Sequence, residues 1–216
     1  MKNEARLDVS RFDRIGMIEA IWGEHKSCEQ IIGILATLES KNLISFVTRI
    51  DSEKARILMQ NFPRSKYHKQ AKCLVLGENI KIYSSLGQVF IISGGTSDAA
   101  VVAETELSLN IHGVKTKVFQ DVGVAGLHRL LDNLKEFESA RVLIACAGME
   151  GALPTVLSGL VPQPVIGIPV SVGYGVSLSG QAALSGMLSS CSPGLTVVNI
   201  DNGYGAAMAA LRILRS

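Results

Sequence analysis

Apolar stretches and amphipathic stretches alternate along the second part of the chain. Continuous apolar runs rich in valine and isoleucine predict five strands, and a segment with helical spacing of its apolar residues follows each of them. Such runs are typical of strands that are covered on both faces. The pattern therefore predicts an α/β domain with a five-stranded, doubly wound parallel sheet. The strands are expected at 87–95, 114–120, 141–148, 164–170 and 195–200, and the helices at 98–110, 125–139, 151–160, 179–190 and 204–216.

The first 85 residues have a less regular pattern, which predicts a small α+β domain. Ser27 and Gln30 have the spacing of a capping box at the start of its second helix. We therefore expect two domains, a small one over 1–85 and a sheet domain over 86–216. The elements of the small domain are expected at 5–23 (helix), 27–42 (helix), 43–50 (strand), 51–63 (helix), 72–77 (strand) and 79–85 (strand).

The composition excludes several classes of protein. The chain has 216 residues, of which 47% are hydrophobic and 19% charged, and this balance indicates extensive burial that includes subunit interfaces. A net charge of +2 and 5% aromatic residues provide no basic surface or stacking platform for nucleic acid. No apolar run reaches the roughly 18–20 residues that span a bilayer, and the N-terminal residues are too charged for a secretory signal. We therefore expect a cytoplasmic homo-oligomer with reduced thiols that binds neither nucleic acid nor a membrane.

Small, polar and flexible residues follow every predicted strand of the sheet domain. In an open parallel sheet, a ligand binds outside the carboxyl ends of the strands, close to the point where the strand order reverses. Glycines let the backbone approach a phosphate and helix N-termini supply N–H donors, so these strand ends favour an anionic, nucleotide-like ligand. An alternative for the first end, SGGTSD, is a plain turn in which Ser97 or Asp98 caps the next helix. The candidate binding residues are Gly95, Thr96, Ser97, Asp98, Asp121, Gly148, Met149, Gly151, Gly175, Asp201, Asn202 and Gly203.

Two residues are candidates for catalysis. Glu150 lies in a glycine-rich loop, where catalytic carboxylates are frequent, and Cys191 lies in a Ser/Pro/Gly loop before the last strand, where a thiol is accessible. The alternatives are a solvated charge and an unreactive loop thiol. We expect Cys146, at the end of an apolar strand, to be a core residue and His128, in an amphipathic helix, to lie at the surface. The cysteines and histidines lack the spacing of a metal cage.

Three segments together carry a family resemblance: GGTSDAAVVAETE, ACAGMEGALPTVLSGLVPQPVIGIPVSVGYG and NIDNGYGAA. They resemble the LarB-type carboxylases of nickel-pincer nucleotide biosynthesis, whose C-terminal domain is similar to aminoimidazole ribonucleotide (AIR) carboxylase and has a flavodoxin-like sheet. The resemblance is close over residues 85–216 and looser before them. The sequence departs from the AIR carboxylases at Ala152, where their loop has a histidine, and at Glu150, which their loop lacks.

The resemblance implies a reaction on nicotinic acid adenine dinucleotide, or an NAD-like dinucleotide. Its pyridinium ring is carboxylated at C5 with CO2 and its phosphoanhydride is hydrolysed, which gives a pyridinium biscarboxylic acid mononucleotide and AMP. The resemblance assigns the nucleophile to Cys191 and an acid–base role to Glu150, which we expect to be desolvated. It implies no tightly bound cofactor; Asp121 and Asp201 are candidates for ribose hydroxyls or for a Mg²⁺ ion. Related carboxylases are octamers, so the resemblance implies a homo-octamer.

Two other functions stay open from the sequence. One is an AIR carboxylase or mutase of purine biosynthesis, and the alanine at position 152 counts against it. The other is a regulator without activity that keeps the nucleotide pocket. The presence of both Cys191 and Glu150 favours catalysis.

Overall fold

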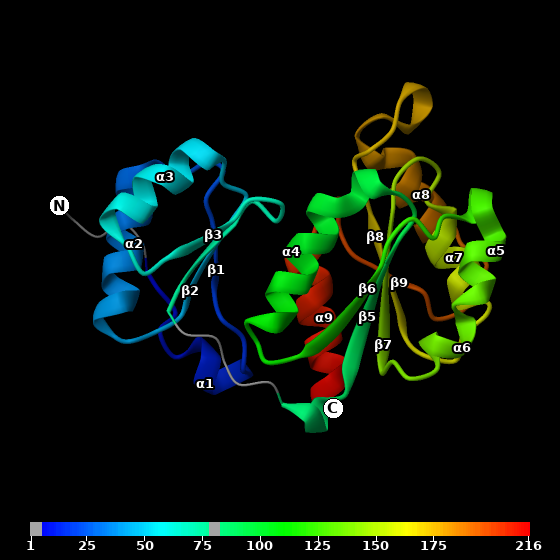
Figure 1. Ribbon diagram of the computed structural model, residues 1–216, viewed down its shortest axis with the longest axis horizontal. Coiled ribbons are helices and arrows are strands. Elements are labelled where there is room, and N and C mark those ends of the chain that lie inside the picture. The colour runs from blue at the N-terminus through cyan, green and yellow to red at the C-terminus, as the bar shows by residue number, and fades with distance from the viewer. Residues whose placement is uncertain (1–5, 78–82) are drawn as a thin grey trace. The chain divides into compact units, whose positions relative to one another are not determined.

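The computed structural model describes residues 6–77 and 83–216, and the chain divides into two compact units, Met1–Ile80 and Lys81–Ser216 (Figure 1). The strand expected over 79–85 falls mostly outside the described residues. In the part of the chain that the structure describes, no helix is both long and apolar enough to cross a bilayer.

The N-terminal unit contains a four-stranded mixed sheet. Its elements are α1 (Arg11–Ile15), β1 (Ala20–Trp22), α2 (Cys28–Ser40), β2 (Ser45–Thr48), α3 (Ser52–Asn61), β3 (Lys66–His68) and β4 (Cys73–Leu76). The sheet has the order β1-β2-β4-β3, in which β1 is parallel to β2 and β4 is antiparallel to both of its neighbours. Ile31 and Leu35 of α2 pack with Leu58 of α3 and with Val47 and Leu74 of the sheet, and these side chains form the core of the unit.

Local signals in the sequence fix the starts of the two long helices. Ser27 accepts the backbone N–H of Gln30, whose side chain accepts the N–H of Ser27, so the expected capping box begins α2. Asp51 accepts the backbone N–H of Lys54 and begins α3 in the same way. Both helices therefore lie where the sequence predicts them.

The prediction of one long helix over 5–23 is wrong. Gly16 adopts a left-handed conformation, with φ of 68°, and ends α1 after five residues. The chain then extends into β1, where Ile21 pairs with β2 and is buried. The apolar spacing of this segment therefore serves two short elements. The strand β3 was not predicted either, because its three residues are mostly polar and lie at the edge of the sheet.

The C-terminal unit contains a five-stranded, all-parallel sheet, which confirms the fold predicted from the sequence. Its elements are η1 (Ser84–Leu86), β5 (Gln88–Ser93), η2 (Thr96–Asp98), α4 (Ala99–Asn110), β6 (Lys115–Phe119), η3 (Val124–Gly126), α5 (Leu127–Asp132), α6 (Leu134–Phe137), β7 (Val142–Ala147), α7 (Ala152–Ser158), β8 (Val165–Pro169), η4 (Gly175–Gly180), α8 (Gln181–Leu188), β9 (Thr196–Val197) and α9 (Gly203–Arg215), where η marks a 3-10 helix. The strand order is β6-β5-β7-β8-β9.

Helices cover both faces of this sheet. The helices α4 and α9 pack together on one face, and α5 to α8 lie on the other (Figure 1). This arrangement follows from right-handed crossovers, because the chain moves outward from β5 to β6 and then returns past β5 to β7. Phe90, Leu143 and Phe137 belong to the core beneath α5 to α8. The strand order reverses between β5 and β7, which is where doubly wound sheets bind their ligands.

Two elements of this unit are shorter than the sequence predicts. The strand expected over 195–200 contains only Thr196 and Val197, because Asp201, with φ of 53°, soon turns the chain into α9. The helix expected over 125–139 is divided at Asn133 into α5 and α6. Neither change alters the sheet order.

Candidate active site

A cleft of about 290 Å³ lies at the carboxyl ends of β5, β6, β7 and β8, beside the point where the strand order reverses. The structure therefore brings together four of the five predicted strand ends, those after β5, β6, β7 and β8. Of the predicted site residues, Gly95, Ser97, Asp98, Gly148, Met149 and Glu150 line this cleft. The other lining residues are Gly94, Gly123, Val124, Ala125, Ala147, Ala152, Leu153 and Val172.

The loop between β5 and α4 is closed by Asp98. Asp98 is 3% exposed as a residue, and its carboxylate accepts the backbone N–H of Gly95 at 2.9 Å. Burial raises the pKa of Asp98 above its usual value; the hydrogen bonds from the backbone of Gly95 and Gly94 oppose this rise, and the charge of Asp201 adds to it. No side-chain hydrogen bond caps α4 at Asp98, so this carboxylate holds the loop rather than the helix.

Glycines let the loops of the cleft approach one another and leave one part of it open. A Cβ atom at Gly148 would lie 2.2 Å from the carbonyl oxygen of Val172, and one at Gly123 would lie 2.5 Å from that of Gly94. These two positions exclude any side chain because backbone atoms occupy the space. At Gly95 a Cβ atom would meet nothing within 4 Å. The backbone at Gly95 therefore faces open space, as an approach to a phosphate requires.

The loop between β7 and α7 carries Glu150 between two left-handed residues. Met149 has φ of 53° and Gly151 has φ of 69°, and the backbone N–H of Met149 donates to the carbonyl of Val172 at 3.0 Å. The loop is thus tied to the strand end after β8. Glu150 lines the cleft with an exposed side chain, so the desolvation expected for it is not found within a single chain.

Left-handed non-glycine residues recur at the ends of these strands. Asp121 follows β6 with φ of 57°, Met149 follows β7, and Asp201 follows β9 with φ of 53°. Such conformations cost of the order of 1 kcal/mol or more and tend to be kept at functional sites. All three were predicted as binding residues from the sequence, although only Met149 lines the cleft.

Cys191 is exposed in the loop after α8 and is not among the residues that line the cleft. The hydroxyl of the next residue, Ser192, donates to the carbonyl of Thr155 at 2.9 Å, which places this loop against α7. Glu150 and Gly151 lie immediately before the same helix, and Thr155 is about 6 Å along its axis from Gly151. The thiol and the carboxylate are therefore associated with one helix, but the thiol lies outside the cleft.

The other predicted cysteine and histidine roles are confirmed. Cys146 is fully buried in β7, and burial, followed by the negative charge of Asp98, raises the pKa of its thiol, so this cysteine is inert. His128 is exposed on α5. Neither residue lines the cleft.

Arg129 is a candidate that the sequence analysis did not single out. It follows the cleft-lining residues Gly123, Val124 and Ala125, and its guanidinium forms an ion pair with Asp121. The signals in the sequence are weak: an arginine shortly after a strand end that contains glycine, and a loose resemblance of Leu127-His128-Arg129 to the Ala-His-Arg motif of AIR carboxylases. Arg129 does not line the cleft, but it follows the lining residues by one turn, and its guanidinium is suited to a phosphate.

The remaining predicted residues have structural partners in the chain. Asp201 accepts the backbone N–H of Ser171 at 2.8 Å, and Asn202 caps α9 by accepting the N–H of Gly205 at 2.8 Å. Gly203 lets α9 pack on α4, since a Cβ atom there would lie 2.8 Å from the hydroxyl of Thr105. Direct contacts of these residues with a ligand stay predictions, as do those of Thr96, Asp121, Gly151 and Gly175, none of which lines the cleft.

Within residues 6–77 and 83–216, no group of three or more histidine, cysteine, aspartate or glutamate side chains is placed to hold a metal ion. Asp121 and Asp201, the candidates for Mg²⁺, have different partners, Arg129 and the backbone of Ser171. We therefore assign no step of the chemistry to a metal.

Comparisons with known proteins agree with the fold. Residues 88–216 match the AIR carboxylase family, and residues 2–78 match the LarB/PurE-like N-terminal domain. The chain therefore belongs to the AIR carboxylase superfamily, as a member of the LarB type. This membership supports a function of the carboxylase or mutase kind.

Individual relatives fit this assignment. An uncharacterized protein of Methanocaldococcus jannaschii is 39% identical over 97% of this chain and 84% of its own length. A probable N5-carboxyaminoimidazole ribonucleotide mutase of Methanothermobacter thermautotrophicus is 30% identical over 59% of this chain and 38% of its own. The crystal structure of a PurE2 variant from Treponema denticola has the same fold, with a TM-score of 0.50 and 24% identity over 59% of this chain and 79% of the PurE2 chain.

Proposed function

We propose that this protein carboxylates C5 of the pyridinium ring of nicotinic acid adenine dinucleotide, or of an NAD-like dinucleotide, and hydrolyses the phosphoanhydride to release AMP. The observation that carries the proposal is the set of side chains in the cleft. Glu150 lines it next to Ala152, and no histidine is among its described lining residues. The AIR carboxylases that this chain resembles have a histidine at the position of Ala152. A cleft that has the carboxylate of Glu150 and lacks this histidine favours a different proton transfer and hence a different substrate.

The chemistry requires a nucleophile because a pyridinium ring is electron-poor and its C5 does not attack CO2. A thiolate that adds to C4 converts the ring to a neutral dihydropyridine, in which C5 has enamine character. C5 then forms a bond to CO2, and the ring nitrogen becomes an iminium. A base removes the proton from C5, and the thiolate leaves C4 with the electron pair of the C–S bond. The aromatic pyridinium returns, now carrying one more carboxylate, so atoms and electrons balance.

Cys191 and Glu150 have the side-chain chemistry that these steps need, and the proposal requires the loop of Cys191, which lies outside the cleft, to reach the ring of the bound substrate. The Cys191 thiol is exposed, whereas Cys146 and Cys73 are buried. Glu150 lines the cleft, and we assign it the removal of the C5 proton. Hydrolysis of the phosphoanhydride then separates the carboxylated mononucleotide from AMP.

The substrate's phosphate has two sets of partners at the cleft. The open backbone at Gly95 provides close approach, and Arg129, whose guanidinium lies next to Gly126, provides a positive charge after the lining residues Gly123, Val124 and Ala125. Arg129 would exchange its ion pair with Asp121 for the phosphate. CO2 needs no charged partner to enter a cleft lined largely by glycine, alanine, leucine and valine.

A homo-oligomer is part of the proposal. The segment after β8 exposes four large hydrophobic side chains, Val172 at 38%, Tyr174 at 76%, Val176 at 97% and Leu178 at 64%. Exposed apolar groups of this kind mark surfaces that are covered in the working protein. We assign the cover to further copies of this chain, in keeping with the octamers of related carboxylases. Sedimentation of a monomer at micromolar concentration would contradict this.

Mass spectrometry of the reaction mixture tests the proposed function. The protein is incubated with nicotinic acid adenine dinucleotide and bicarbonate, and the expected products are a mononucleotide with one additional carboxylate and an equal amount of AMP. Glu150→Gln should abolish both products, whereas Glu138→Gln, which changes an exposed carboxylate away from the cleft, should not. The similarity to the mutase supports one rival, a reaction on aminoimidazole ribonucleotide. Turnover of that compound with the dinucleotide left unchanged would overturn the proposal.

A further inference from the structure

A second cavity, of about 220 Å³, lies wholly in the N-terminal unit, and the reaction proposed above does not use it. Its walls come from the segment around α1 and from the end of α2. Apolar side chains form most of it, and three carboxylates and one amide complete it. The lining residues are Asp8, Val9, Phe12, Asp13, Met17, Ile18, Glu19, Leu38, Asn42, Leu43 and Ile44.

The end of α2 builds one wall through a Schellman motif. Asn42 is left-handed, with φ of 54°, and its N–H donates to the carbonyl of Glu39, while the N–H of Leu43 donates to that of Leu38. This motif brings the side chains of its two leucines together, and both line the cavity. The wall is therefore fixed by backbone hydrogen bonds.

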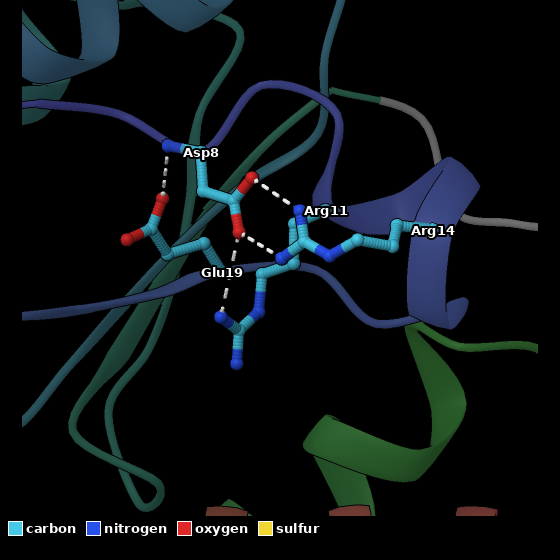
Figure 2. A network of polar contacts seen from close by, with 4 residues as sticks. All are labelled: Asp8, Arg11, Arg14 and Glu19. Atoms are coloured by element: carbon cyan, nitrogen blue, oxygen red, sulfur yellow. Dashed lines mark hydrogen bonds and ion pairs between the residues drawn. The ribbon is translucent and has the colours of Figure 1, made fainter.

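The segment around α1 contributes lining residues that belong to an ion-pair network around Asp8 (Figure 2). Its carboxylate accepts two hydrogen bonds from the guanidinium of Arg14, and Arg11 lies 3.8 Å from one of its oxygens. On the other side, the backbone N–H of Asp8 donates to one oxygen of Glu19 at 3.1 Å. The Arg14 hydrogen bonds hold the pKa of Asp8 below its usual value, so this carboxylate is charged and already paired.

The remaining polar groups define the ligand chemistry. Asp13 and the second oxygen of Glu19 are acceptors with no donor on the described walls of the cavity, and Asn42 offers both a donor and an acceptor. Such a set complements a ligand that donates N–H groups and also accepts a hydrogen bond. The volume is below the roughly 300–1,000 Å³ of sites for drug-sized ligands, so it fits one ring system rather than a whole nucleotide. Phe12 and the aliphatic side chains suit the faces of a planar ring.

We propose that this cavity binds a planar heterocycle with an exocyclic amine, and that its ligand is the adenine ring. The amine would donate to the carboxylates of Asp13 and Glu19, and a ring nitrogen would accept from Asn42. Arg11 and Arg14, which pair with Asp8 of the cavity lining, suit the phosphate of the same nucleotide. The choice of adenine rests on the proposed function, whose substrate and product both contain it.

Titration calorimetry on the full chain tests the inference with AMP and inosine monophosphate, which has a carbonyl in place of the amine. AMP should bind at least tenfold more tightly than inosine monophosphate. The carbonyl of inosine monophosphate is an acceptor, so it would face the carboxylates of Asp13 and Glu19 without donating a hydrogen bond to either. Asp13→Asn and Glu19→Gln should each weaken AMP binding about tenfold. Glu53→Gln is the matched control, since it changes an exposed carboxylate of α3 that is not part of the cavity. Equal affinities for the two nucleotides, or AMP binding that responds to Glu150→Gln and not to Asp13→Asn, would overturn the inference.

Kinetics with the dinucleotide distinguish the two sources of the ring. If Asp13→Asn raises KM for the dinucleotide by the same factor by which it weakens the binding of AMP, the cavity holds the adenine of the substrate. If KM is unchanged, the cavity holds free AMP. The AMP titration does not require turnover, so failure of the proposed reaction and failure of this inference are separate results.

Discussion

Two alanine substitutions in the cleft should have opposite effects on stability and binding. In Gly148→Ala the new methyl would lie 2.2 Å from the carbonyl oxygen of Val172. Backbone atoms cannot rotate away, so the strand ends after β7 and β8 must separate. Overpacking of this kind costs about 1–3 kcal/mol, and a cost of about 2 kcal/mol lowers Tm by about 4–8 °C in a chain of this size.

Gly95→Ala adds the same methyl group at a glycine whose Cβ position faces open space. The backbone there is extended, with φ of −150° and ψ of 171°, and the methyl meets no atom within 4 Å. Stability should therefore stay the same or rise by up to about 1 kcal/mol. The methyl instead fills the space through which a phosphate approaches the backbone, and we expect affinity for the dinucleotide to fall at least tenfold, which corresponds to about 1.4 kcal/mol.

Scanning calorimetry and titration calorimetry on both variants separate these effects. The reasoning requires a lower Tm for Gly148→Ala and a lower affinity, without a lower Tm, for Gly95→Ala. If Gly95→Ala bound the dinucleotide as the unchanged protein does, the loop after β5 would not contact the ligand. If Gly148→Ala kept its Tm, the close packing of the two strand ends would be refuted.

Two further substitutions test single charges. Arg129→Gln should raise KM for the dinucleotide about tenfold with little change in kcat. The substitution removes a charge that binds the phosphate equally in the ground state and in the transition state. A loss confined to kcat would contradict this role. Burial lowers the pKa of His112 from 6.5 to about 4, so the unfolded chain gains a proton between those pH values that the folded chain does not. The contribution of His112 to the free energy of unfolding should be fully present above pH 6.5 and should fall by about 3 kcal/mol as the pH drops to 4. In denaturant titrations, His112→Asn should remove this part of the decline. An unchanged decline in the variant would refute the assignment to His112.

The sheet domain was predictable because its apolar runs are continuous and are separated by glycine-rich strand ends. Burial on both faces makes each strand apolar throughout, so β5, β7 and β8 lie within the ranges that the pattern indicates. The same strand ends also indicated most of the cleft. Periodicity failed at 5–23, where Gly16 divides one amphipathic pattern between a short helix and a strand. The cavity of the N-terminal unit lies in that region, and no motif indicated it.

The site was predictable in part. Residues next to strand ends, such as Gly95 and Glu150, line the cleft because strand order alone brings them together. Arg129 was missed because its position depends on how α5 begins, and the place of Cys191 depends on the hydrogen bond of Ser192 to Thr155. Long-range contacts of this kind leave no periodic signal in a single sequence.

The mass of the intact protein tests the covalent step most directly. The protein is mixed with the dinucleotide and bicarbonate, quenched during turnover, and measured beside Cys191→Ser and Cys28→Ser, which removes another thiol that is not fully buried. The account predicts an adduct of a pyridine nucleotide on the unchanged protein and on Cys28→Ser, and none on Cys191→Ser, together with loss of turnover in that variant alone. An adduct that persists in Cys191→Ser, or turnover that survives the substitution, would contradict the claim that this thiol activates the ring.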